Sequence, residues 1–166
     1  MYTGRTMDGE RRLPGLEQAI RAGGVHHGLP AASKAEAFAV LVERMSLPPD
    51  ADRRALLKLL LDRESLGSTA VGEGVALPHV RNPAAVRIPA ASVTVGFLEG
   101  PVEFGALDGR PVHTLLAIVS PTVRTHLRLL SLLSYGLRQG DFRAAILERK
   151  ALEAILAAAR AVDEAV

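Results

Sequence analysis

The segment from Ser68 to Arg81, STAVGEGVALPHVR, brings together residue types that can do chemistry. It holds a hydroxyl pair, a Gly-x-Gly turn and a histidine directly after a proline. Pro78 lacks a backbone N–H and has a fixed φ, so it favours a strand end or an edge over a ladder interior. Gly72 and Gly74 permit a tight turn that returns the chain to the same place. The pattern predicts a His79 imidazole held on a rigid, exposed ledge.

A histidine in this setting can serve several kinds of chemistry. A metal site needs two or three further ligands, and the sequence contains neither H-x-H nor H-E-x-x-H. Thiolate chemistry is excluded because there is no cysteine, and the G-x-S-x-G turn of many hydrolases is absent. Histidine acting as its own nucleophile remains, with a phosphoryl group as the natural electrophile.

The competing interpretation is an ordinary surface histidine on a β-turn-β unit. Under the nucleophilic interpretation, Ser68 and Thr69 are expected to supply hydroxyl donors near the ring. If a backbone carbonyl holds Nδ1 of His79, the exposed lone pair is on Nε2, which is then the expected point of attack. Of the other histidines, His26 and His27 are expected to be ordinary, and His113 is expected at the solvent end of a strand.

The composition predicts one globular domain. The chain has 166 residues, of which 48% are apolar and 23% charged. The net charge is +2 with no basic run and no tryptophan, which argues against nucleic-acid binding. The N-terminus is polar, and no stretch approaches the roughly 20 apolar residues of a membrane span. A cytoplasmic protein that is not membrane-embedded is therefore expected.

Helix signals occur on both sides of the segment that carries the histidine. Ser33 and Glu36 have the spacing of a capping box and predict a helix over 33–46, ended by a Pro-Pro pair. The next helix, over 53–64, is capped by Asp50 or Asp52. Leucines at helical spacing predict a helix over 122–138, with two shorter helices over 141–149 and 151–163; these leucines and a serine are Leu127, Leu130, Leu133, Ser134 and Leu137.

Two strands lie between these helices. Residues 91–98 place Val93, Val95 and Phe97 on alternate positions. Residues 112–121 form a continuous run of β-branched and aliphatic residues, typical of a central strand buried on both faces. The turn-rich stretch between them suggests a hairpin-like connection. We therefore expect an α/β fold with a single domain, a mixed sheet of about five strands and helices on both faces, after a mobile tail at residues 1–12.

The ordered motifs resemble a known family. LLDRESLGSTAVGEGVALPH is similar to the active-site segment of IIA components of the bacterial phosphoenolpyruvate-dependent phosphotransferase system, in the mannitol/fructose class. LDGRPVHTLLAIVSP and HLRLLSLLSYGLRQGDFRAAIL resemble the second half of the same domain. With SKAEAFAVLVERM, the resemblance covers about residues 13–160 and implies that residues 13–166 form this domain, which looks closest to the nitrogen-regulatory IIA type.

The resemblance implies roles for three residues. His79 matches the phosphorylated histidine, which receives its phosphoryl group from the phosphocarrier HPr. His126 matches a second active-site histidine that stabilises the group, and a helix N-terminus there adds free N–H donors. Arg63 matches an arginine near the phosphoryl group, which its planar fork can bind. Arg81 is a basic residue that often follows the motif. Val80 replaces a smaller residue, and it is expected to narrow partner access or rigidify the ledge.

The implied function is that of a free-standing phosphocarrier component rather than a stand-alone enzyme. A regulatory, nitrogen-type IIA is expected, with a IIB component or a regulated transporter or kinase as further partner. The alternatives are a sugar-transport IIA that passes phosphate to a separate IIB, and a degenerate binding module that carries no phosphate. No metal and no cofactor are expected, since the donor brings the phosphate already activated.

Overall fold

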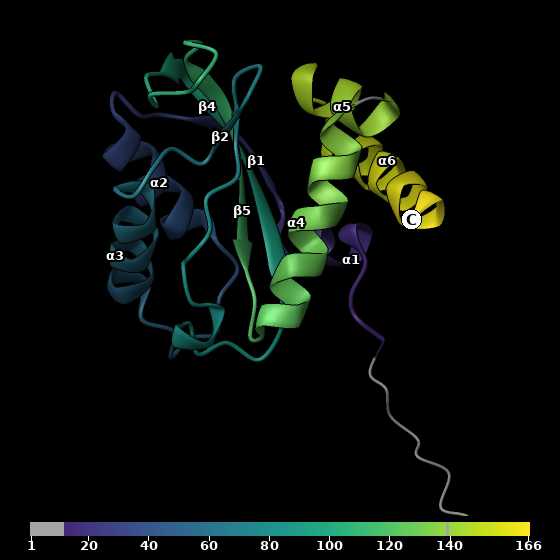
Figure 1. Cartoon of the computed structure of the whole chain (residues 1–166), viewed down its shortest axis with the longest axis horizontal. Helices are drawn as coiled ribbons and strands as arrows, with labels where there is room; N and C mark the ends of the chain where they lie inside the picture. The colour runs from purple at the N-terminus through teal and green to yellow at the C-terminus, as the bar shows by residue number, and fades with distance from the viewer. Residues whose placement is uncertain (1–11, 139) are drawn as a thin grey trace, which may run out of the picture.

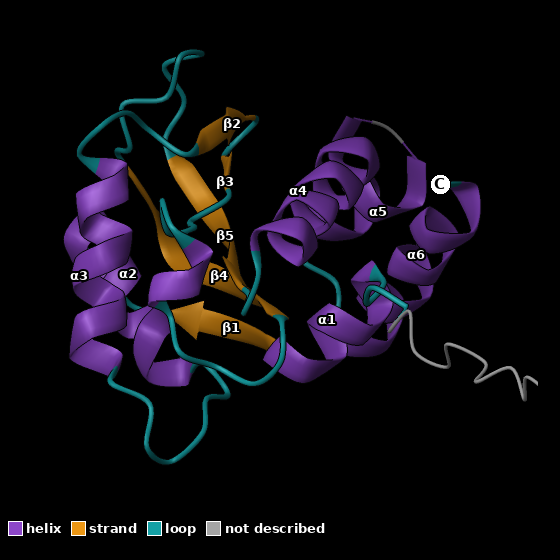
Figure 2. Ribbon diagram, turned by 60° about the horizontal axis from the view of Figure 1, so that its bottom comes forward, coloured by secondary structure: helices purple, strands orange, loops and turns teal. Residues whose placement is uncertain are grey.

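The structure is a computed structural model that describes residues 12–138 and 140–166. A mixed, five-stranded sheet lies between two layers of helices (Figures 1 and 2). The strand order is β1-β4-β5-β3-β2, with β1 at Val25–Leu29, β2 at Ala70–Gly72, β3 at Val75–Ala76, β4 at Ser92–Val102 and β5 at Val112–Val119. The expected tail at residues 1–12 falls almost wholly outside the described residues and stays a prediction.

The middle strand of the sheet is β5. It pairs antiparallel with β4, as the hairpin-like connection predicted, and parallel with β3. Leu116 and Ile118 contribute to the apolar core on one face of the sheet, and Leu115 and Ala117 to the core on the other. The prediction of a central strand buried on both faces is confirmed.

Helices cover both faces of the sheet, as expected (Figure 2). One face carries α2 and α3, at Lys34–Arg44 and Arg53–Glu64. The other face carries four helices, which are α1 at Leu16–Gly23, α4 at Val123–Arg138, α5 at Gly140–Leu147 and α6 at Leu152–Ala165. A short 3₁₀ turn, η1, spans Pro83–Ala85. Within the described residues, none of the helices combines the length and apolarity needed to cross a membrane.

The local start signals of α2 and α3 work as predicted. The Ser33 hydroxyl accepts a hydrogen bond from the backbone N–H of Glu36 at 3.2 Å. The Asp52 carboxylate accepts one from the N–H of Ala55 at 3.0 Å, so Asp52 rather than Asp50 caps α3. These side chains satisfy N–H groups that have no partner inside their helices.

Two elements, α1 and β1, have no counterpart in the sequence-based expectations. Gly15 precedes α1 and has no side chain to cap it. Its cap comes from α6, where the Asp163 carboxylate accepts hydrogen bonds from the N–H groups of Leu16 at 2.6 Å and Glu17 at 3.1 Å. Asp163 lies 147 residues from Leu16, so no local pattern could reveal this helix start.

The residues that α4 buries differ from those that the spacing of its leucines predicts. Leu129, Leu132 and Leu133 face the core, whereas Leu127 is 58% exposed. Spacing identifies the helix but not which side of a broad leucine surface meets the sheet. The exposed Leu127 directly follows His126, so apolar surface lies next to the predicted site.

Candidate functional site

The sheet brings His79 and His126 together. Strands β3 and β5 are parallel, so the chain leaves both at the same edge of the sheet. The Pro78 carbonyl accepts a hydrogen bond from the N–H of Ile118 at 2.9 Å, which extends the pairing of β3 with β5 up to His79. After β5, the first turn of α4 carries His126. The two ring centroids are 5.3 Å apart, inclined at 52°, within reach of one phosphoryl group, as expected.

A backbone carbonyl fixes the orientation of the His79 ring. Nδ1 lies 2.7 Å from the Leu77 carbonyl oxygen, and a carbonyl only accepts, so Nδ1 carries the proton. The Nε2 lone pair is then free. Burial lowers the pKa of His79, the Leu77 carbonyl opposes this shift, and the positive charge of Arg63 lowers the pKa further. The His79 ring is therefore neutral near pH 7, with the lone pair of Nε2 unprotonated.

His126 is more deeply buried than His79. Only 6% of the residue is exposed, and its Nδ1 is buried without a hydrogen-bond partner among the described residues. Burial, followed by the nearby His79, lowers the pKa of His126 to about 4. A neutral ring with an unpaired buried nitrogen is uncommon in a folded protein.

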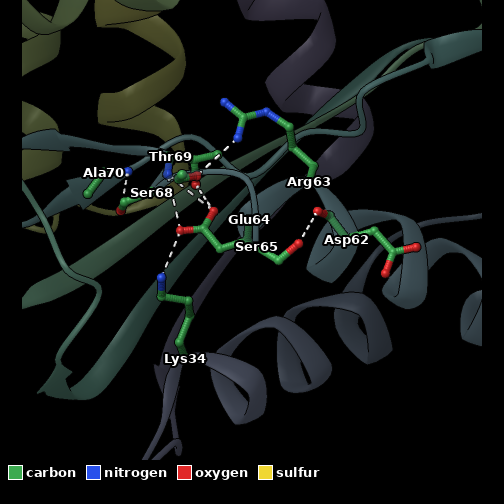
Figure 3. A network of polar contacts seen from close by, with 9 residues as sticks. Lys34, Asp62, Arg63, Glu64, Ser65, Ser68, Thr69 and Ala70 are labelled. Carbon is green, nitrogen blue, oxygen red and sulfur yellow. Dashed lines mark hydrogen bonds and ion pairs between the residues drawn. The ribbon is translucent and has the colours of Figure 1, made fainter.

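Arg63 lies in the last turn of α3, beside the loop that leads to β2 (Figure 3). Its Nη1 donates a hydrogen bond to the Gly67 carbonyl at 3.0 Å, which holds the side chain against this loop. Its charge acts on His79, whose pKa it lowers. Arg63 therefore lies near enough to His79 for its charge to act on that ring, while its described hydrogen bond is to Gly67.

The hydroxyl pair behaves differently from the expectation. The Thr69 hydroxyl donates to a Glu64 carboxylate oxygen at 2.6 Å and is buried, so it is not available to a ligand at His79. The expectation of a Thr69 donor is therefore wrong. The Ser68 hydroxyl accepts from the Ala70 N–H at 3.1 Å, which leaves its own proton free. Glu64 was not anticipated, because a glutamate beside an arginine usually reads as a solvated helix end.

The glycine turn has the conformation that the motif predicted. Gly72 and Gly74 have φ values of +100° and +79°, which only glycine adopts readily. A Cβ on Gly74 would lie 2.4 Å from the His113 ring. The turn is also anchored through Glu73, whose N–H donates to Asp108 at 2.9 Å and whose carboxylate pairs with Arg143.

The outcome for Val80 corrects one expectation. The Val80 side chain is 2% exposed and packs in the core on the α2 and α3 face. Successive residues of an extended chain point to opposite sides, so Val80 points away from the face on which His79 meets His126. It therefore does not narrow the access of a partner to His79. Its burial in this core instead holds the backbone beside His79 in place. Arg81 is exposed beside the site.

The lowered pKa values predict a specific response to acid. The pKa of His126 is about 4 in the folded protein and about 6.5 in an unfolded chain, so the unfolded state binds more protons between these values. Stability should fall as the pH drops from about 6.5 towards 4. NMR titration of the ring signals and urea unfolding at several pH values measure this. A His126 ring that titrates at or above 6.5 would contradict the burial argument.

Comparison with known proteins adds an independent observation. Residues 19–160 match the sequence model of the family described as "Phosphoenolpyruvate-dependent sugar phosphotransferase system, EIIA 2". A nitrogen regulatory protein of Pseudomonas aeruginosa is 35% identical over 145 residues, covering 84% of this chain and 91% of that protein. A fructose-specific EIIABC component of Bacillus subtilis is 37% identical over 107 residues, 63% of this chain but only 16% of that protein.

A solved structure shares the fold. The crystal structure of the nitrogen regulatory protein IIA-Ntr from Neisseria meningitidis superimposes with a TM-score of 0.70 at 28% identity. The similarity covers 81% of this chain and 92% of that one. The family match and the structural match therefore each cover most of the chain.

Proposed function

The chain belongs to the EIIA 2 family of the phosphoenolpyruvate-dependent sugar phosphotransferase system, and from this premise we propose that His79 carries a phosphoryl group. The donor is an HPr-type phosphocarrier protein. The chain acts as a regulatory IIA, in keeping with the nitrogen regulatory proteins that it resembles. A cytoplasmic location is part of the same proposal, as is the assignment of residues 13–166 to one EIIA domain.

The observation that carries the proposal is the tethered ring of His79 beside the buried ring of His126. The Nε2 lone pair attacks phosphorus, an Nε2–P bond forms, and the donor's P–N bond breaks with its electron pair remaining on the donor imidazole. His79 keeps its Nδ1 proton, so the step needs no general base. The Leu77 carbonyl continues to accept that proton and offsets the positive charge that develops on the ring.

The other groups stabilise the transferred phosphoryl. His126 donates one ring N–H to a phosphoryl oxygen, and its low pKa keeps it a neutral hydrogen-bond donor. Arg63 provides a positive charge and further N–H donors. Ser68 and the exposed Arg81 are supporting groups, and Pro78, Gly72 and Gly74 hold the backbone that presents His79.

We propose that the phosphocarrier contacts exposed apolar side chains of this chain that lie beside these residues. Val123 and Leu127 flank His126 on α4 and are exposed, and the exposed Leu66 is hydrogen-bonded through its backbone to Arg63. Exposed apolar side chains around a charged centre suit a transient protein interface. A donor histidine can then meet His79 with water partly excluded.

A second candidate is a sugar-transport IIA that passes phosphate to a separate IIB component. It is favoured by the similarity to the fructose-specific EIIABC component of Bacillus subtilis, although the chain spans only 16% of that protein. The chemistry at His79 is the same in both cases, and only the acceptor differs.

The test uses the whole chain with labelled phosphoenolpyruvate, Enzyme I and HPr, from the same organism where they can be obtained. Label should appear on the protein, be lost in mild acid and survive base, as expected of phosphohistidine. A chain that stays unlabelled with its own carriers would instead be a binding module without phosphotransfer. Adding a fructose-type IIB then separates the two candidates, because rapid loss of label to IIB indicates the transport role.

A further inference from the structure

A buried carboxylate lies behind the loop that precedes His79. Glu64, at the end of α3, is 6% exposed. Its carboxylate accepts hydrogen bonds from the Thr69 N–H at 3.1 Å and the Thr69 hydroxyl at 2.6 Å, and from Lys34 Nζ at 3.1 Å (Figure 3). Three donors therefore converge on one carboxylate, which fixes Thr69 to the ends of α2 and α3.

The same network continues from Thr69 to the ring of His79. The Thr69 carbonyl accepts a hydrogen bond from the Leu77 N–H at 3.0 Å. The Leu77 carbonyl accepts the Nδ1 proton of His79 at 2.7 Å. We call these residues, Lys34, Glu64, Thr69 and Leu77, the Glu64 network.

We propose that Glu64, acting through Thr69, is a positioning residue that sets the tautomer of His79 and thereby aims its nucleophilic Nε2. The tautomer claim concerns the unphosphorylated protein; the consequence for phosphotransfer rests on the proposed function. Glu64 itself is not a catalytic residue, because its carboxylate faces Thr69 and Lys34 and is hydrogen-bonded there.

The physical argument concerns which bonds hold the Leu77 peptide. The following residue, Pro78, is tied to β5 through its carbonyl, which accepts from Ile118. Pro78 has no N–H, so the peptide group between Leu77 and Pro78 donates no hydrogen bond to a neighbouring strand. Its carbonyl can therefore turn towards the His79 ring. The N–H side of Leu77 is held by Thr69, and Thr69 is held by Glu64. Loss of the carboxylate therefore frees the peptide whose carbonyl selects the tautomer.

Three substitutions test the network. Thr69→Val keeps the shape and the backbone N–H but removes the hydroxyl bond, while Glu64 keeps its charge. Thr69→Ser restores the hydroxyl. Glu64→Gln removes the charge and places an amide donor opposite other donors. Asp62→Asn is the matched control, since Asp62 lies on the same helix in an exposed pair with Lys58 at 2.7 Å.

The first measurement is the tautomer of His79 by ¹H–¹⁵N NMR of the unphosphorylated protein, with thermal unfolding to confirm that each variant is folded. Thr69→Val and Glu64→Gln should shift the ring from the Nδ1–H tautomer towards the Nε2–H tautomer, which free histidine prefers in water. Thr69→Ser and Asp62→Asn should retain the parent tautomer. Because Thr69→Val leaves the charge of Glu64 in place, its shift separates geometry from electrostatics.

The second measurement is the initial rate of phosphoryl labelling, which should fall by about 10-fold in Thr69→Val and more in Glu64→Gln, as expected for lost orientation of a nucleophile. An unchanged tautomer in folded Thr69→Val overturns the inference, whatever the labelling shows. If the parent itself takes no label, the proposed function fails, while the tautomer comparison still decides the role of Glu64.

Discussion

His79→Ala should abolish phosphoryl labelling entirely. The substitution removes the ring whose Nδ1 is tethered to the Leu77 carbonyl and which lies next to the ring of His126. No neighbouring group should replace it, since His126 is only 6% exposed and Arg63 is a cation without a lone pair to donate. The measurement is incorporation of label from phosphoenolpyruvate through Enzyme I and HPr, followed over time.

The matched control for this loss is His27→Ala. His27 lies on β1 and contacts Phe97 and the carbonyls of Arg149 and Lys150, on other elements of the fold. It should label at the parent rate, which shows that loss of a histidine as such has no effect. Labelling of His79→Ala at the parent level would disprove the site assignment.

His126→Ala should still accept label, but about 100-fold more slowly, which is typical of removing one hydrogen-bond donor to the charge that develops in a transition state. The nucleophile is intact in this variant, and only stabilisation of the phosphoryl oxygens is lost. His126→Asn restores a neutral N–H donor and should recover part of the rate. The initial rate of labelling, measured at a fixed concentration of phosphorylated HPr, separates the three proteins.

The pH dependence supplies a check on the same residue. A neutral donor with a pKa of about 4 does not change its charge between pH 6 and pH 8. Loss of His126 should therefore slow labelling by a similar factor throughout this range. A factor that grows steeply below pH 7 would mean that His126 acts as a cation, contrary to its burial.

Features that depend on near neighbours in the chain could be predicted from the sequence. Ser33 and Glu36, three residues apart, specify the start of α2 through one hydrogen bond. The run from Leu115 to Val119 in β5 specifies a strand buried on both faces, because it shows no alternation of apolar and polar residues. The Gly-x-Gly turn and Pro78 specify how His79 is presented, because glycine and proline restrict the backbone themselves.

The residues of the candidate site could be predicted from the sequence less completely than the local structure. The order of motifs indicates His79, His126 and Arg63 as candidates, and the structure brings the ring centroids of the two histidines to 5.3 Å. The sequence indicates neither the burial of Glu64 nor its bond with the Thr69 hydroxyl, because a sequence does not show where a hydroxyl points. For Val80 the sequence leaves two expectations open, narrowed partner access or a rigid backbone, and its packing in the core under α2 and α3 excludes the first.

The tertiary structure alone decided the properties that arise from contacts between distant segments of the chain. The cap of α1 comes from Asp163, 147 residues from Leu16, and the low pKa of His126 comes from burial under the folded chain. Desolvation and hydrogen bonding depend on the atoms that surround a group in space. The sequence determined which residues are candidates for phosphoryl chemistry and which local backbone presents them. The packing of α4 and of the loop after α3 against the sheet decided their protonation, their orientation and their separation.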